Sequence, residues 1–100
     1  MAQPLGRAGR LLRQVRAGMA VYDRHRARVG TVAAVYLGGE DPAVAATMPA
    51  TAPRGLAARG FVEIEAGPLA PRCYAAGGQL AGVAGERVLL NVGGDYLIRR

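Results

Sequence analysis

The sequence predicts a mainly β fold: a small, strongly bent β-barrel of five to six strands, preceded by a basic N-terminal arm. Its 100 residues suffice for one domain with a modest core. Fifteen glycines and six prolines separate short apolar segments, which favours short strands over long helices. The segments Gly18 to Asp23 and Arg28 to Val32 describe a tight hairpin. Pairing of this hairpin with residues 86–92 predicts a barrel that closes on itself.

Two strands are expected in the first third of the chain. The first spans 15–22 and the second 28–37, and a turn at 23–26 joins them. Small residues at Gly30 and Ala34 of the second strand permit close approach of another backbone or a sharp bend. By strict alternation, the residues that share the other face of this strand are Val29, Thr31, Ala33, Val35 and Leu37.

Four more strands are expected after residue 59. Residues 60–66 alternate between apolar and acidic side chains. We therefore expect Val62 and Ile64 to point inward, while the carboxylates of Glu63 and Glu65 face water. The remaining strands are expected at 69–75, 80–83 and 87–92.

The chain divides into a basic arm at 1–14 and a single barrel domain at 15–98. The arm is expected to form an extended tail or a short helix. Within the domain, residues 38–59 show no hydrophobic periodicity and are long for a loop of a compact domain. Their small, mostly uncharged side chains favour a flexible excursion over an ordered functional loop.

The formal net charge of +6 lies entirely in the first quarter of the chain. Residues 1–28 hold seven arginines and one acid, whereas residues 29–100 hold six of each. On a helix, arginines spaced every three residues form a broad stripe that attracts phosphates, anionic lipid or an acidic protein surface. An ordinary solvated tail is the alternative, and the arm has no aromatic residues for stacking on bases. The candidate polyanion-binding residues are Arg7, Arg10, Arg13, Arg16, Arg24 and Arg26.

The residue types present disfavour an enzyme. The chain has no Ser and no Lys, one His and one Cys, so the usual nucleophile–base pairs cannot be built. His25 lies in the charged turn without a second metal ligand nearby. Cys73 has no partner for an internal disulfide and is expected to be a buried structural thiol. We therefore expect no catalytic residue, no metal and no cofactor.

The hydropathy pattern does not indicate a membrane span. No apolar run approaches the roughly 18–20 residues that cross a bilayer. The N-terminus also lacks the apolar core of a secretory signal. The expected location is the cytoplasm.

Several segments together resemble the PRC-barrel superfamily. That superfamily includes the cytoplasmic domain of the photosynthetic reaction-centre H subunit, the C-terminal domain of a ribosome maturation factor and short stand-alone bacterial proteins. The resemblance implies a small barrel used as a docking module, without shared functional residues that could be transferred. Cys73 to Ala76 stands where stand-alone relatives have an Ile-Pro step. The resembling segments are Val15 to Asp23, Val29 to Val32, Phe61 to Glu65, and Val83 with Gly85 to Val92.

These observations predict a non-enzymatic protein-interaction module of a bacterial cell, with a protein partner that the sequence does not define. Small barrels leave strand edges and apolar patches, which a partner or a second copy in a homodimer can cover. The alternative is a nucleic-acid or ribosome-associated protein that contacts RNA or DNA through its Arg-rich first quarter.

Overall fold

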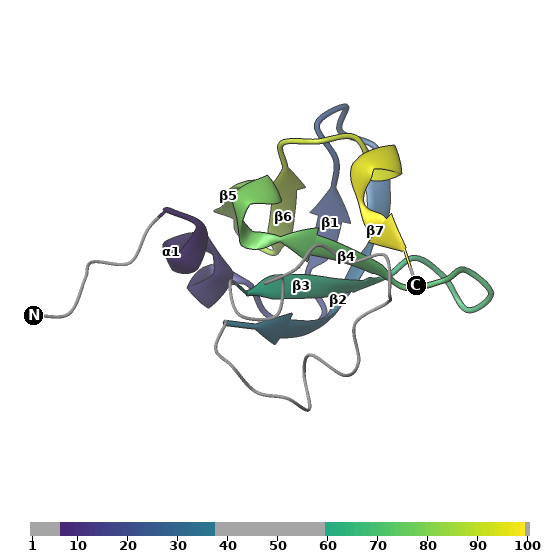
Figure 1. Cartoon of the computed structure of the whole chain (residues 1–100), viewed down its shortest axis with the longest axis horizontal. Helices are drawn as coiled ribbons and strands as arrows, with labels where there is room; N and C mark the ends of the chain where they lie inside the picture. Colours follow the sequence, from purple (N-terminus) through teal and green to yellow (C-terminus); the bar gives the residue numbers. More distant parts are fainter. Residues whose placement is uncertain (1–6, 38–59, 100) are drawn as a thin grey trace, which may run out of the picture.

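A computed structural model of the chain describes residues 7–37 and 60–99, so the predicted loop at 38–59 lies outside the described residues. The described part is mainly β, with a single seven-stranded sheet and one α-helix (Figure 1). In chain order the elements are α1 (Arg7–Gln14), β1 (Ala20–Tyr22), β2 (Arg28–Tyr36), β3 (Phe61–Glu65), β4 (Cys73–Ala76), the 3-10 helix η1 (Gly77–Gln79), β5 (Leu80–Ala84), β6 (Arg87–Leu90), the 3-10 helix η2 (Gly94–Tyr96) and β7 (Ile98–Arg99).

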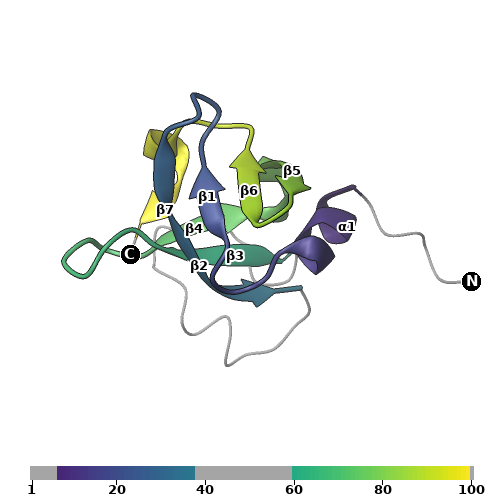
Figure 2. The ribbon, with the colours of Figure 1, turned by 180° about the vertical axis from the view of Figure 1, so that it is seen from behind.

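The strands follow the order β5-β6-β1-β2-β3-β4-β7 across the sheet. Strands β1 to β6 correspond to the six predicted strands, and the additional strand, β7, has two residues. The opening strand β1 pairs in parallel with the closing strand β6, which confirms the predicted pairing of these two segments. The sheet is strongly curved (Figure 2). Within the described residues the edge strands β5 and β7 do not pair with each other, so the described part of the sheet is not closed.

Strand β2 approaches the end of β3 at a glycine. A Cβ atom built at Gly30 would overlap the backbone carbonyl oxygen of Glu65, so only glycine fits there without a backbone shift. This close approach confirms the prediction made for Gly30. It allows the long strand β2 to pair with β1 along one part and with β3 along the other.

Two register shifts change the alternation of side chains along β2. Against β1 the extra residue is Val29, and against β3 it is Ala33. Each such bulge bends the strand and moves the following side chains to the other face. The predicted alternation is therefore wrong: Val32 is buried in the core and Val35 packs against the same cluster.

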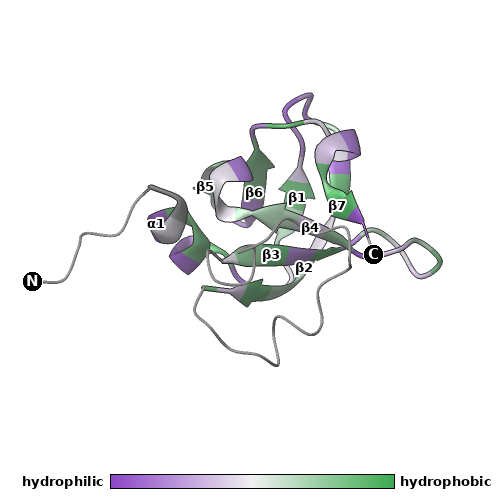
Figure 3. Cartoon of the chain, in the orientation of Figure 1, coloured by the Kyte–Doolittle hydropathy of each residue, from purple (hydrophilic) through white to green (hydrophobic). Residues whose placement is uncertain are grey.

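The main core lies between the curved sheet and α1. The helix contributes Leu12, which is fully buried, and it packs against η1 and β5. Leu11 and Leu12 of the predicted arm thus pack with the core of the strands. Hydrophobic residues are concentrated along the strands, whereas the turn between β1 and β2 is largely hydrophilic (Figure 3). The buried residues of this core are Leu12, Val15, Met19, Val21, Val32, Val62, Ile64, Cys73, Ala75, Leu80, Val88, Leu90 and Leu97.

A smaller aromatic cluster occupies the opposite face of β2, β3 and β4. The rings of Tyr36 and Phe61 stack with centroids 4.5 Å apart, and Tyr74 meets Phe61 edge-on at 5.8 Å. Phe61 and Tyr74 are both buried. Because the aromatic cluster covers one face of β3 and the main core covers the other, β3 is buried on both faces near its start.

Glu63 lies beside this aromatic cluster. Its carboxylate forms an ion pair with Arg72 at 3.4 Å and accepts a hydrogen bond from the Tyr74 hydroxyl at 3.4 Å. The Glu63 side chain is only 15% exposed, so the expectation that it faces open water is wrong. The expectations for Val62, Ile64 and Glu65 are confirmed, since the first two are buried and Glu65 is exposed.

Candidate functional site

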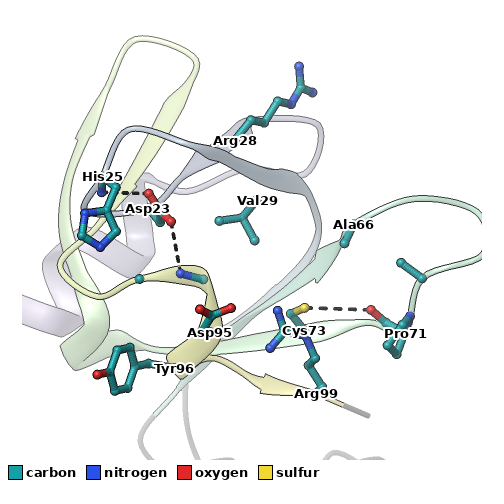
Figure 4. A pocket seen from close by; sticks show the side chains of 13 residues that line it. Asp23, His25, Arg28, Val29, Ala66, Pro71, Cys73, Asp95, Tyr96 and Arg99 are labelled. Carbon is teal, nitrogen blue, oxygen red and sulfur yellow. Dashed lines mark hydrogen bonds between the residues drawn. The ribbon is translucent and has the colours of Figure 1, made fainter.

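A pocket of about 360 Å³ opens at the end of the sheet where β1 turns into β2. We call it the end pocket. Its walls come from the β1–β2 turn, the loop between β3 and β4, and η2 with β7 (Figure 4). In Figure 4, Val29, Asp95 and Arg99 gather around the hollow, whereas Arg28 extends away from it. Its lining includes Val29, Ala66, Pro71, Cys73, Asp95 and Arg99.

Asp23 fixes one wall of the end pocket. Its Oδ1 atom accepts hydrogen bonds from the backbone N–H groups of His25 at 2.8 Å and Ala27 at 3.0 Å. Its Oδ2 atom accepts a third from the N–H of Gly94 at 3.2 Å. The N–H of Arg24 also donates to the carbonyl of Val92 at 3.0 Å. The turn is thereby held against the segment that leads into η2.

These hydrogen bonds change the acidity of Asp23. Desolvation raises the pKa of its carboxyl, but three backbone N–H groups and the charge of His25 act in the opposite direction and prevail. The pKa of Asp23 therefore lies below its ordinary value. The carboxylate is ionised near neutral pH, and its oxygens are already occupied by the fold.

The turn itself requires an unusual backbone conformation. Arg26 has φ of 64°, in the left-handed region, and its N–H donates to the carbonyl of Asp23 at 3.0 Å. Arg24, His25 and Arg26 are all exposed. Arg28 is exposed as well, and its guanidinium donates to the Thr31 hydroxyl at 3.2 Å. The turn thus presents several cations to solvent beside the pocket.

The structure separates the predicted polyanion-binding residues into two groups. Arg7, Arg10 and Arg13 belong to α1 and Arg16 follows it, and this segment lies near η1 and β5. Arg24 and Arg26 lie in the turn that contacts the segment before η2. The six arginines therefore do not form one continuous surface (Figures 1 and 2).

In the helical group, three arginines lie on the surface of the domain. Arg10, Arg13 and Arg16 are exposed, while Leu12 and Val15 between them are buried. A second pocket, of about 340 Å³, lies between this segment and the β5–β6 turn. Its lining residues include Arg13, Arg16, Met19, Val83 and Glu86.

The end pocket contains a thiol and an imidazole, but they are not arranged for nucleophilic catalysis. Cys73 is 1% exposed, and its thiol donates toward the carbonyl of Pro71 at 3.9 Å. His25 is exposed and its ring points away from the thiol (Figure 4). Across residues 7–37 and 60–99, no group of three or more His, Cys, Asp or Glu side chains is placed to hold a metal ion.

Two large apolar side chains, both on segments that contribute to the end pocket, are strongly exposed. Leu69 is 99% exposed in the loop next to the lining residue Ala70, and Tyr96 in η2 is 76% exposed. Sequence reasoning missed both, because it placed Leu69 at the start of a strand and gave Tyr96 no functional role. The signal was available: Gly67, Pro68 and Pro71 surround Leu69 and mark a loop.

Among the described residues, no helix is long and apolar enough to cross a membrane. Comparison of the chain with family models, curated proteins and solved structures finds no match.

Proposed function

We propose that this chain is a protein-docking module that binds a segment of another protein at the end pocket. The observation behind the proposal is the exposure of Leu69 and Tyr96, at 99% and 76%. Tyr96 lines the end pocket, and Leu69 belongs to the loop that contributes Ala70 and Pro71 to its lining. Exposed large apolar groups that cluster at one place are typical of interaction sites. Aromatic side chains beside a pocket are also frequent binding hot spots.

The size and rigidity of the end pocket support the same proposal. Its volume of about 360 Å³ is near the lower end of ligand pockets, which suits one inserted side chain better than a large cofactor. The hydrogen bonds of Asp23 hold the turn and the η2 segment together without a ligand. A preformed wall lowers the entropy lost on binding.

Crosslinking at the proposed surface tests the docking function. The photo-crosslinking amino acid p-benzoylphenylalanine replaces Leu69 in the full chain, expressed in the native host. The matched control carries it at Leu89, which is 37% exposed on β6 and does not line the end pocket. A defined protein crosslinked from position 69 and absent in the Tyr96→Ala background supports docking. Equal crosslinking from both positions contradicts it.

We further propose that the chain is a divergent relative of the PRC-barrel superfamily and that its sheet closes into a barrel. The parallel pairing of β1 with β6 and the curvature of the sheet support this. Solution NMR provides the test. Nuclear Overhauser effects linking the two edges of the sheet would support closure, and their absence from a fully assigned spectrum would contradict it.

Polyanion binding through α1 is a second candidate function. It is favoured by the burial of Leu12, which holds the helix on the domain while Arg10, Arg13 and Arg16 stay exposed. Fluorescence anisotropy with labelled RNA and DNA oligonucleotides tests it. The triple substitution to Ala should weaken binding and lower its salt dependence by about one counterion for each arginine removed. The control pair Arg24→Ala with Arg26→Ala should have no such effect.

A further inference from the structure

We infer that the occupant of the end pocket is Leu69 of a second copy of this chain, and that two copies exchange this side chain in a symmetric dimer. The inference rests on the proposed docking function and names the docked protein as a second copy. It follows from the loop between β3 and β4, which carries an exposed apolar tip and also forms part of the pocket.

The β3–β4 loop presents Leu69 at the tip of a closed turn. The backbone N–H of Ala70 donates to the carbonyl of Gly67 at 3.3 Å, with Pro68 and Leu69 between them. Because proline has a fixed φ angle, this turn loses little entropy when it is bound. The loop extends away from the rest of the described chain (Figures 1 and 2), and Leu69 is 99% exposed. Leu69 does not line the end pocket of its own chain, so it can enter that of another.

The lining of the end pocket is balanced in charge. It holds Arg28 and Arg99 against Asp23 and Asp95, with His25 neutral. Arg28 extends away from the hollow (Figure 4), and Asp23 already accepts three backbone hydrogen bonds. A charged group that entered would meet a carboxylate as well as a guanidinium, so neither sign of charge is preferred. The balance favours an uncharged occupant.

Residues 66–71 form a segment of this kind. Their sequence, Ala-Gly-Pro-Leu-Ala-Pro, has no charged side chain, and its prolines have no backbone N–H to leave without a partner on burial. Val29 and the buried Cys73 in the pocket lining offer a leucine side chain dispersion contacts and removal from water. The incoming loop would also cover part of Tyr96, which lines the pocket and is 76% exposed.

The tip and the pocket belong to one region of the surface. The loop that carries the tip also lines the pocket through Ala66, Ala70 and Pro71. A two-fold axis through such a region lets each copy supply one tip and receive one. Both contacts then close within a dimer, whereas a tip and a pocket on distant surfaces would generate open filaments. The expected assembly is therefore a dimer.

Analytical ultracentrifugation of the purified full chain, from micromolar to millimolar concentration, tests the inference. We expect a reversible monomer–dimer equilibrium. Leu69→Ser should raise the dimer dissociation constant by about a hundredfold, because two leucines leave the interface and each contributes about tenfold. The matched control Leu89→Ser, at a position that does not line the pocket, should leave it unchanged. A monomer at every concentration, or equal weakening by both substitutions, overturns the inference. Thermal melts check that both variants are folded.

Isotope-filtered NMR on an equal mixture of labelled and unlabelled chain locates the contact in the unmodified protein. Nuclear Overhauser effects from the Leu69 methyl groups of one copy to Val29 or Tyr96 of the other support the exchange. A dimer whose assigned intermolecular effects all lie elsewhere overturns it.

The outcomes also separate this inference from the docking proposal. If the chain is monomeric but a different protein is crosslinked from position 69 in the host and lost in the Tyr96→Ala background, the docking site stands. The second copy then falls as its occupant. If the chain is monomeric and position 69 crosslinks no defined protein, both proposals fall.

Discussion

The carboxylate of Asp23 accepts a hydrogen bond from the backbone N–H of Gly94 at 3.2 Å, although 71 positions separate the two residues in the chain. The same side chain closes its own turn through the N–H groups of His25 and Ala27. One carboxylate therefore stabilises the first hairpin locally and attaches it to the last quarter of the chain. Together with the bond from Arg24 to Val92, it shapes the wall of the end pocket.

The lowered pKa of Asp23 predicts a specific acid sensitivity. The folded-state pKa lies below the ordinary value of 3.8, so the stabilising contribution of Asp23 is present above that value. It disappears as the pH falls through the folded-state pKa. In Asp23→Asn this part of the pH dependence should be absent, and the protein should be less stable near neutral pH. Urea unfolding of both proteins at several pH values measures the difference.

A matched control uses the other carboxylate of the pocket. Asp95 is exposed, so Asp95→Asn should leave the acid dependence of unfolding close to that of the unmodified chain. If Asp23→Asn retains the full acid dependence, Asp23 is not its source.

Arg26→Gly should stabilise the protein. Arg26 has φ of 64°, a conformation that costs a residue with a side chain about 1–2 kcal/mol and costs glycine very little. The greater backbone freedom of glycine in the unfolded chain offsets part of this gain. The free energy of unfolding should rise by about 0.5–1 kcal/mol. Arg24→Gly, at a turn position without positive φ, should give no increase.

Gly30→Ala should destabilise the protein, because its Cβ would overlap the carbonyl oxygen of Glu65 in the neighbouring strand. Backbone atoms cannot move as easily as a side chain, so we expect a loss of about 1–3 kcal/mol. Gly82→Ala on β5 is the control, since a Cβ there meets no atom within 4 Å. Chemical denaturation of both variants gives the comparison, and equal stabilities would contradict the close approach.

Leu12→Ala tests whether α1 belongs to the folded domain. Leu12 is fully buried, so its truncation should lower the free energy of unfolding by about 2–5 kcal/mol. Leu69→Ala removes the same atoms from a side chain that is 99% exposed and should change stability by less than about 0.5 kcal/mol. Similar small effects at both positions would mean that residues 7–14 are a solvated tail.

Local sequence patterns predicted where the strands lie better than they predicted which side chains of each strand point into the core. Residues 60–66 alternate regularly, and the structure buries Val62 and Ile64 as expected. Strict alternation was also assumed for strand β2, yet its bulges at Val29 and Ala33 change which side chains share a face. A bulge depends on how the neighbouring strands pair, so the sequence of one strand does not reveal it.

The end pocket could not be predicted from the sequence either, because it also depends on how distant segments of the chain come together. Its walls join residues from distant parts of the chain, such as Val29, Cys73 and Arg99, none of which has a distinctive local motif. The Arg-rich stripe was predicted because it depends only on helical spacing. The separation of these helical arginines from Arg24 and Arg26 was not predicted, because it depends on which end of the sheet each segment reaches.

The parallel pairing of β1 with β6 has a consequence for biosynthesis. Residues Ala20 to Tyr22 lie between β2 and β6, so half of their ladder partners belong to a strand that begins at Arg87. During translation the first hairpin is synthesised early. Its pairing with β6 can form only after most of the chain has been made. Such non-local pairing slows folding and leaves an unpaired strand edge open to wrong partners. A nascent chain from which β6 has not yet left the ribosome should therefore be sensitive to proteases, and one in which residues 7–99 have all emerged should be resistant.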